Sequence, residues 1–224
     1  MNDVNNSISV LFFGRKGDIY SIKCHKHLLD LDFDVTVVWS SKRGEKLPQE
    51  IYLKNYDYIF CFRSYFILPR QLLESVNFEC INFRNTDLRS TDFTGSNLKG
   101  ANFSGANLED ANFDNVELDN ADFSNANLSY ALISTSARNV DFSNADLQNA
   151  NLSGSILILS NFQKANLEGA DLWDSDMSSS NFSNANLTNS DLSESSMINS
   201  NFSNADVTRA NIWGTDFTNS SINL

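Results

Sequence analysis

The residues whose types and spacing could do chemistry are few, and most lie in the first part of the chain. Cys24, His25 and His27 stand together in the segment "KCHKH", where a thiol and two imidazoles could bind a metal ion. Only Cys24 and His27, three positions apart, share a face of the expected helix, and two ligands do not make a metal site. We therefore expect these residues to lie on the surface of a helix, with no metal bound.

Phosphate, calcium and covalent chemistry have little support in the sequence. Gly14 and Gly17 in "GRKGD" match neither glycine pattern of phosphate-binding loops, so a turn from strand to helix explains them. The many Asp residues of the second part stand singly and lack the ligand cluster of a calcium site. No nucleophile, base and orienting group can be assembled, which predicts a protein without catalytic residues, cofactor or metal.

The composition indicates a folded, soluble protein. The chain has 224 residues, of which 41% are hydrophobic, enough for a packed interior. The first residues contain no basic leader before an apolar stretch, and no run of about 18 apolar residues occurs, so we expect a cytoplasmic protein with no membrane contact. Cys24, Cys61 and Cys80 are odd in number and widely spaced, which predicts reduced thiols.

The net charge of −12 is unevenly distributed along the chain. Residues 1–77 carry ten Lys or Arg and nine Asp or Glu, whereas residues 78–224 carry six and nineteen, a net charge of −13. Nucleic acid is not an expected ligand of the second part, because phosphate binding needs clustered basic side chains. A protein partner with a basic surface is expected instead.

An apolar residue recurs every five positions from Phe83 to Ile133, and again from Phe142 to Ile222. A small residue such as Ala101 usually stands two positions earlier, and Asn or Asp stands one position earlier. A period of five fits neither an amphipathic helix nor an ordinary strand. The pattern therefore indicates a repeat architecture.

The aromatic residues give the size of the repeat. Phe142, Phe162 and Phe182 are twenty positions apart, which predicts a four-sided coil of four five-residue units with an interior column of rings. Phe142 follows Phe123 by only nineteen positions, so we expect a locally irregular corner within "SYALISTSARNV". Roughly seven coils with a rise of about 4.8 Å would give a rod of about 34 Å.

The recurring pattern, as in "ANFSGANLEDANF" and "ANLEGADLWDSDM", resembles the pentapeptide-repeat family over about residues 81–222. The resemblance implies a right-handed quadrilateral β-helix whose Leu or Phe and small residues point inward. A single coil cannot bury its apolar residues alone, whereas stacking pairs the backbone groups and builds a continuous core. Residues 78–224 are therefore assigned to a pentapeptide-repeat domain.

Residues 1–77 show a different pattern of alternating elements. Strands are expected at "ISVLFFG", "DVTVVWS", "YDYIFCF" and "FECINF", with helical segments between them at "DIYSIKCHKHLLDL", "QEIYLKN" and "RQLLESV". This alternation predicts a parallel sheet covered by helices. The expected fold class is α+β multidomain: a β-helix solenoid capped at its N-terminal end by a small truncated Rossmann-like α/β domain.

The stretch "YDYIFCFRSYFILPRQLLESVNFECINFR" resembles the N-terminal half of the folate-dependent formyltransferases. The resemblance implies that Asn82 stands at the family's catalytic Asn, that Arg84 replaces the catalytic His, and that the catalytic Asp and half of the folate pocket are missing. An Arg that stays charged cannot act as a base at neutral pH, so we expect no formyltransferase activity. Residual ligand binding is the alternative, at Phe62, Ser64, Ile67 and Leu68.

Most outward positions of the repeats hold Ser, Asn, Thr or Gly, and two groups of residues depart from this pattern. The first is an acidic belt on the first coils: Glu109, Asp110, Asp114, Glu117, Asp119 and Asp122. The second consists of large apolar residues that are expected to face solvent, some aligned in columns: Trp173, Trp213, Ile156, Ile158, Leu159 and Ile198. Aligned exposed apolar side chains indicate a contact surface, with tolerated surface residues as the alternative.

These features predict a non-enzymatic interaction protein. Some pentapeptide-repeat proteins resemble a DNA duplex in width, shape and acidity and protect DNA gyrase or topoisomerase IV from inhibitors, so the resemblance implies a bacterial DNA mimic. Two alternatives stay open: a generic protein-protein interaction scaffold, and a degenerate partner or remnant of a sugar N-formyltransferase. The segment "NIWGTDFTNSSINL" has no obvious capping helix, so a homodimer through the C-terminal coil is expected to cover that end.

Overall fold

The computed structural model describes residues 9–17, 22, 26, 29, 34–40, 58–62 and 82–222. Three strands of the front part form one parallel sheet in the order β2-β1-β3: β1 (Ser9–Arg15), β2 (Asp34–Ser40) and β3 (Tyr58–Phe62). In this sheet Val10 of the central strand β1 lies opposite Val35 of β2 and Tyr58 of β3. The parallel pairing predicted for these three strands is confirmed.

The apolar run of β1 explains its central place in the sheet. Val10, Leu11 and Phe12 are fully buried, and because successive residues point to opposite faces, both faces of this strand are covered. Ile22, Lys26 and Leu29 are helical, within the segment where a helix is predicted. The predicted helices at "QEIYLKN" and "RQLLESV", and the part of "FECINF" before Asn82, lie outside the described residues.

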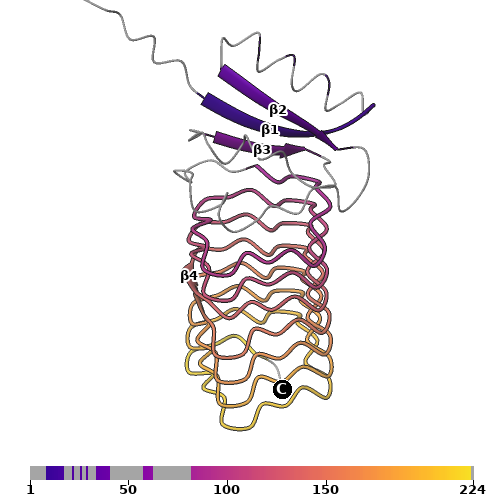
Figure 1. The fold of residues 1–224 in the computed structure, drawn as a ribbon. Helices are drawn as coiled ribbons and strands as arrows, with labels where there is room; N and C mark the ends of the chain where they lie inside the picture. The colour runs from indigo at the N-terminus through magenta and orange to yellow at the C-terminus, as the bar shows by residue number, and fades with distance from the viewer. Residues whose placement is uncertain are drawn as a thin grey trace, which may run out of the picture.

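From Asn82 onward the chain forms stacked coils (Figure 1). Parallel bridges join residues twenty positions apart, such as Asn82 with Asn102 and Asn102 with Asp122. Backbone hydrogen bonds connect each coil to the next, as from Phe83 N to Asn102 O at 2.6 Å and from Leu88 N to Asn107 O at 2.7 Å. The predicted twenty-residue coil is confirmed.

Each regular five-residue side ends in a two-residue turn whose second residue has a positive φ, for example 59° at Asn125 and 66° at Gly169. This left-handed conformation is open to Gly and tolerated by Asn, which explains why the two residue types recur at this position. Tyr130 and Leu159 also occupy it, with φ values of 60° and 62°. Their side chains project into solvent and are 59% and 49% exposed.

The Asn or Asp that precedes each inward apolar residue makes two kinds of hydrogen bond. Its side-chain oxygen accepts from the backbone N–H two residues later, as Asn102 Oδ1 does from Ser104 N at 2.9 Å. An Asn at this position also donates to the preceding coil, as from Asn186 Nδ2 to Asn166 Oδ1 and from Asn166 Nδ2 to Asp146 Oδ1, both at 3.0 Å. This ladder of side chains sets the turn geometry, so many of the Asp residues have a structural role.

Columns of apolar side chains fill the interior of the rod. Ring centroids stack 4.7 Å apart between Phe162 and Phe182 and 4.9 Å apart between Phe142 and Phe162. The spacing widens to 5.2 Å between Phe123 and Phe142, the pair that the nineteen-residue interval separates. The predicted interior column therefore continues across the irregular corner.

The irregular corner lies between Ile133 and Ala137, two buried residues that are four positions apart instead of five. Leu132 occupies the ladder position before this corner, and its side chain has no oxygen to accept from the turn. Short parallel strands follow, β4 (Ser136–Arg138) paired with β5 (Ile156–Ile158). A surface hollow of about 360 Å³ opens at this corner, lined in part by Asn115, Glu117, Ser134, Ser136, Gly154 and Ile156.

Figure 1 places the β2-β1-β3 sheet over the first coil and the C-terminus at the opposite end of the rod. Leu11 and Val38 belong to the same buried apolar cluster as Phe83 and Leu88. Covering the end of a solenoid removes its apolar interior and unpaired backbone groups from solvent. The capping role and the Rossmann-like fold expected of the front part stay predictions.

Two inward hydroxyls of the first coil, Thr91 Oγ1 and Ser96 Oγ, are buried without a hydrogen-bond partner among the described residues. Ser175, in the same column as Ser96, donates to Leu172 O at 2.7 Å. We expect Ser96→Ala to leave the free energy of unfolding unchanged or raise it by about 1 kcal/mol, and Ser175→Ala to lower it by about 1 kcal/mol. Urea unfolding measures both; an equal loss in the two variants would contradict the unpaired state of Ser96.

Candidate protein-interaction surface

Asn82 and Arg84 are parts of the first coil. Asn82 forms a bridge with Asn102, and its Oδ1 accepts from Arg84 N at 3.0 Å. The carboxamide thus has the turn-forming role that Asn has in later coils, while Arg84 is exposed. Asn82 therefore occupies a ladder position, where its side-chain oxygen already accepts a hydrogen bond from the turn.

The other candidate residues of the front part lie outside the described side chains: Cys24, His25, His27, Phe62, Ser64, Ile67 and Leu68. Among the residues that the structure describes, no group of three or more His, Cys, Asp or Glu could hold a metal ion. A search of the same residues finds no helix long and apolar enough to cross a membrane. The outward side chains of the rod form the remaining candidate surface.

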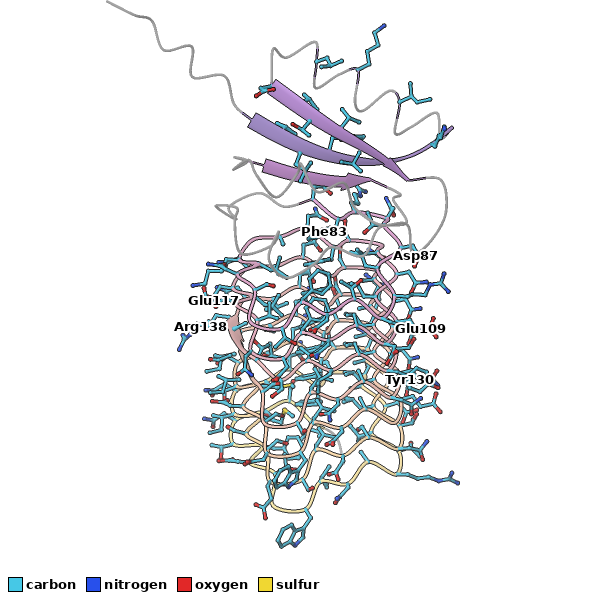
Figure 2. The ribbon with its side chains drawn as sticks, viewed as in Figure 1. Phe83, Asp87, Glu109, Glu117, Tyr130 and Arg138 are labelled. Carbon is cyan, nitrogen blue, oxygen red and sulfur yellow. The ribbon has the colours of Figure 1, made fainter. Side chains whose placement is uncertain are left out.

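The six acidic residues of the predicted belt lie on one coil but project from different sides of it. Figure 2 shows Glu109 and Glu117 on opposite sides of the rod. Lys99 Nζ lies 3.0 Å from Glu117 Oε2 and 3.5 Å from Asp119 Oδ2. The hydrogen bond and charge of Glu117 raise the pKa of Lys99. The belt therefore encircles the rod, and Lys99 offsets part of its charge on one side.

One side of the rod carries acidic residues without any base, and we call it the acidic side. It consists of the outward positions beside the inward residues Phe93, Phe113, Ile133, Leu152, Leu172, Leu192 and Ile212. These positions include no Lys or Arg, and their carboxylates are Asp92, Asp114, Asp171, Asp174, Asp191 and Glu194. By contrast, the side of the Phe162 column carries Arg84 and Lys164 beside Asp122 and Asp141. The side of the Leu167 column also carries six carboxylates, but it includes Arg89 and Arg209, so the acidic side has the largest net negative charge.

Two exposed aromatic residues also lie on the acidic side. Trp173 is 50% exposed and Trp213 is 72% exposed, in the turns after Leu172 and Ile212. Gly154, which lines the hollow, donates from its backbone N to Trp173 O at 2.8 Å, so the hollow and Trp173 are adjacent. These positions agree with the outward placement expected of both tryptophans, and their role in contacts stays a prediction.

The aliphatic residues of the predicted surface differ in exposure. Ile156 is 43% exposed, whereas Ile158 and Ile198 occupy outward positions but are half-buried. Arg138 lies opposite Ile158 in the β4–β5 pair, and side chains about 4.8 Å apart along a column cover one another. Tyr130 was not among the expected surface residues, although its place in a turn position that usually holds Asn or Gly signals an outward aromatic side chain.

Hydrogen bonds fix some of the carboxylates beside the tryptophans. Asp191 Oδ1 accepts from Ser193 Oγ at 2.5 Å and from Ser193 N at 2.9 Å. Asn211 Nδ2 donates to the same oxygen at 3.1 Å. The Ser193 hydroxyl in particular holds the pKa of Asp191 below its usual value, so this carboxylate stays negatively charged at neutral pH.

The stacked five-residue sides, inward Leu or Phe and side-chain ladder define a β-solenoid of the repeat class. Residues 138–223 match the family model described as Pentapeptide repeats, and residues 67–152 match the model described as Pentapeptide repeat region. The two matches together span well over half of the chain. The chain therefore belongs to the pentapeptide-repeat proteins through residues 67–223.

Solved structures of other pentapeptide-repeat proteins are similar to this chain. HetL, involved in heterocyst differentiation regulation in the cyanobacterium Nostoc sp. strain PCC 7120, matches with a TM-score of 0.56 and 21% identity over 74% of this chain and 79% of HetL. This likeness shows the fold alone. No curated protein matches the sequence.

Two further pentapeptide-repeat structures match this chain with lower TM-scores. QnrB1, a plasmid-mediated fluoroquinolone resistance protein, has a TM-score of 0.36 and 22% identity over 69% of this chain and 81% of its own. A pentapeptide repeat protein from the Arabidopsis thaliana thylakoid lumen has a TM-score of 0.25 and 36% identity over 40% of this chain and 60% of its own.

Proposed function

We propose that this protein is a non-enzymatic binding protein of the bacterial cytoplasm whose acidic rod occupies a DNA-binding surface of DNA gyrase or topoisomerase IV. The observation that carries the proposal is the charge of the repeats, nineteen Asp or Glu against six Lys or Arg in residues 78–224. Over about 34 Å of coils this is one net negative charge per ~2.6 Å, compared with about 1.7 Å in duplex DNA. The rod is a polyanion of lower but comparable charge density.

This negative charge is largest on the acidic side, which is the face expected to meet a basic partner. Its carboxylates stand on a backbone that is hydrogen-bonded from coil to coil, and Asp171 Oδ1 accepts from Trp173 N at 3.0 Å. Little ordering is needed when such a surface meets a basic partner, which favours binding. Electrostatic steering raises the association rate and makes it sensitive to salt. These properties support a partner that normally binds DNA.

Supercoiling assays with purified gyrase, run with and without a quinolone, test the proposed function. An excess of the protein is expected to inhibit supercoiling, because the rod competes with DNA, and to reduce the DNA cleavage that a quinolone stabilises. If supercoiling and cleavage are the same with and without the protein, the DNA-mimic function is wrong.

A general protein-protein scaffold is the second candidate, and the exposure of Ile156, Trp173 and Trp213 favours it. Under this function the double variant Trp173→Ser/Trp213→Ser should change the oligomeric state in sedimentation or abolish binding to a defined protein. An unchanged oligomeric state together with unchanged binding would count against the scaffold. The homodimer expected through the C-terminal coil stays a prediction for the same sedimentation experiment.

A remnant or partner subunit of a sugar N-formyltransferase is the third candidate. The parallel β2-β1-β3 sheet, followed by Asn82 at the start of the coils, is the observation that favours it. Calorimetric titration with a folate and with a nucleotide sugar tests this function. An absence of binding heat with both ligands would remove it.

A further inference from the structure

Trp173 and Trp213 form a pair on the acidic side with a gap between them. They occupy one outward column two coils apart, so their backbones are separated by about 9.6 Å along the rod. Ser193 stands between them and is 6% exposed, whereas the tryptophans are 50% and 72% exposed. A planar group in contact with both rings needs them about 7–8 Å apart, which exposed rings can reach by changes of side-chain torsion.

The backbone holds the two tryptophans at a fixed spacing. Trp173 N donates to Asp171 Oδ1 at 3.0 Å, and Trp173 O accepts from Gly154 N at 2.8 Å. Trp213 O accepts from Glu194 N at 2.8 Å. Only side-chain torsions need to change when a ligand enters the gap, so the entropy cost of binding is small.

Carboxylates lie on both sides of the tryptophan column. Asp171 and Asp191 occupy the ladder positions before it, and Asp174 and Glu194 occupy the turn positions after it. A Cβ on Gly214 would lie 2.7 Å from Glu194 Oε2, so this carboxylate sits over the residue that follows Trp213. Among the described residues, none donates to or forms an ion pair with the carboxylate of Asp174 or Glu194.

We propose that Trp173 and Trp213 hold an arginine side chain of a basic partner segment between their rings, with Asp174 and Glu194 as its ion-pair partners. The inference rests on the proposed function and names the chemistry of the partner. A guanidinium is planar and weakly hydrated, so it can stack on both rings at once while it meets a carboxylate through its N–H edge. A lysine ammonium is compact and strongly hydrated and cannot stack in this way.

Indole N–H signals in NMR spectra of the full ¹⁵N-labelled chain report on this site. The chain has three tryptophans, Trp39, Trp173 and Trp213, and single substitutions assign their signals. A hexa-arginine peptide is expected to shift the signals of Trp173 and Trp213 together. Hexalysine should bind at least about 5-fold more weakly, and hexacitrulline, which is planar but uncharged, should cause no shift.

The variants Trp173→Ser and Trp213→Ser test the role of each ring. Both introduce the residue that already stands at Ser193 in the same column, so the fold should be retained, and the dispersion of the remaining amide signals checks this. Each is expected to weaken hexa-arginine binding about 5- to 10-fold. The control Tyr130→Ser removes an exposed aromatic side chain from another side and should leave the affinity unchanged. Equal affinities for arginine and lysine peptides, or unchanged affinity in both tryptophan variants, would overturn the inference.

Failure of this inference can be distinguished from failure of the proposed function. If the double tryptophan variant binds gyrase and hexa-arginine as the unmodified protein does, the arginine site is wrong and the proposed function stands. If hexa-arginine binds between the tryptophans but gyrase does not bind the protein, the proposed function is wrong and the arginine site stands.

Discussion

Replacing Phe162 by Ala is expected to lower the free energy of unfolding by about 3–5 kcal/mol. Phe162 is fully buried, and its ring stacks on Phe142 at 4.9 Å and on Phe182 at 4.7 Å. Removing the ring leaves a cavity that the neighbouring coils cannot close, because the backbone hydrogen bonds hold their spacing. Urea unfolding gives the total loss, and hydrogen exchange locates it, since each coil contacts only its neighbours.

Phe217→Ala is the matched control for this variant. Phe217 is half-buried and contacts Phe202 edge-on at 5.5 Å, in the last coil. Phe217→Ala should lower the free energy of unfolding by less than half as much as Phe162→Ala, because part of the Phe217 ring is already in solvent. Similar losses at the two positions would show that stacking in the interior column is not the main source of stability.

Removing the charge beside the tryptophans is expected to weaken binding to gyrase about 10- to 100-fold at low salt. The variant combines Asp171→Asn, Asp174→Asn, Asp191→Asn and Glu194→Gln. Asn keeps a side-chain oxygen at the two ladder positions, so the hydrogen bonds to Trp173 N and Ser193 N can persist. Surface plasmon resonance at several salt concentrations measures the effect, which should appear mainly as a slower association.

The control for this experiment removes the same number of charges from other sides of the rod. It combines Asp122→Asn, Asp141→Asn, Asp146→Asn and Glu168→Gln, whose positions adjoin the inward residues Phe123, Phe142, Leu147 and Leu167. The control should reduce binding only a few-fold, through the lower net charge. Equal effects in the two variants would mean that net charge alone, and not the acidic side, determines binding.

The regular part of the rod is predictable from the sequence for a simple physical reason. Phe162 and Phe182 are twenty residues apart because the coil closes after four equal sides, and the same interval sets their stacking at 4.7 Å. Asn or Asp recurs because its oxygen must accept from the turn, as Asp171 Oδ1 does from Trp173 N. In these units local geometry and tertiary packing demand the same residue types, so the pattern determines both.

The position of the missing residue could not be predicted. A deletion anywhere within "SYALISTSARNV" gives the same nineteen-residue interval between Phe123 and Phe142. The structure places it after Ile133, where Leu132 cannot supply the turn-forming oxygen and the hollow opens. The choice depends on how Ala137 and Thr135 pack, which is a tertiary property.

The acidic side could not be predicted from the sequence either. The sequence shows a dense run of acidic residues around Glu117, but Lys99 pairs with Glu117 across a coil and reduces its charge. Assigning each carboxylate to a side requires the phase of every coil. The short corner at Ser134 changes that phase by one residue for every later carboxylate, from Asp141 onward. Counting charged residues along the sequence therefore predicts the sign of the partner's charge, but it does not identify the surface that contacts the partner.

Competition with DNA for gyrase tests whether the rod occupies a DNA-binding surface of the enzyme. Fluorescence anisotropy follows a labelled DNA duplex bound to gyrase while the protein is added at low and at physiological salt. We expect the unmodified protein to displace the duplex and to do so more weakly at higher salt, and we expect the variant of the acidic side to lose about 10- to 100-fold in potency. If the duplex stays bound at low salt with the protein in large excess, the rod does not compete with DNA for gyrase.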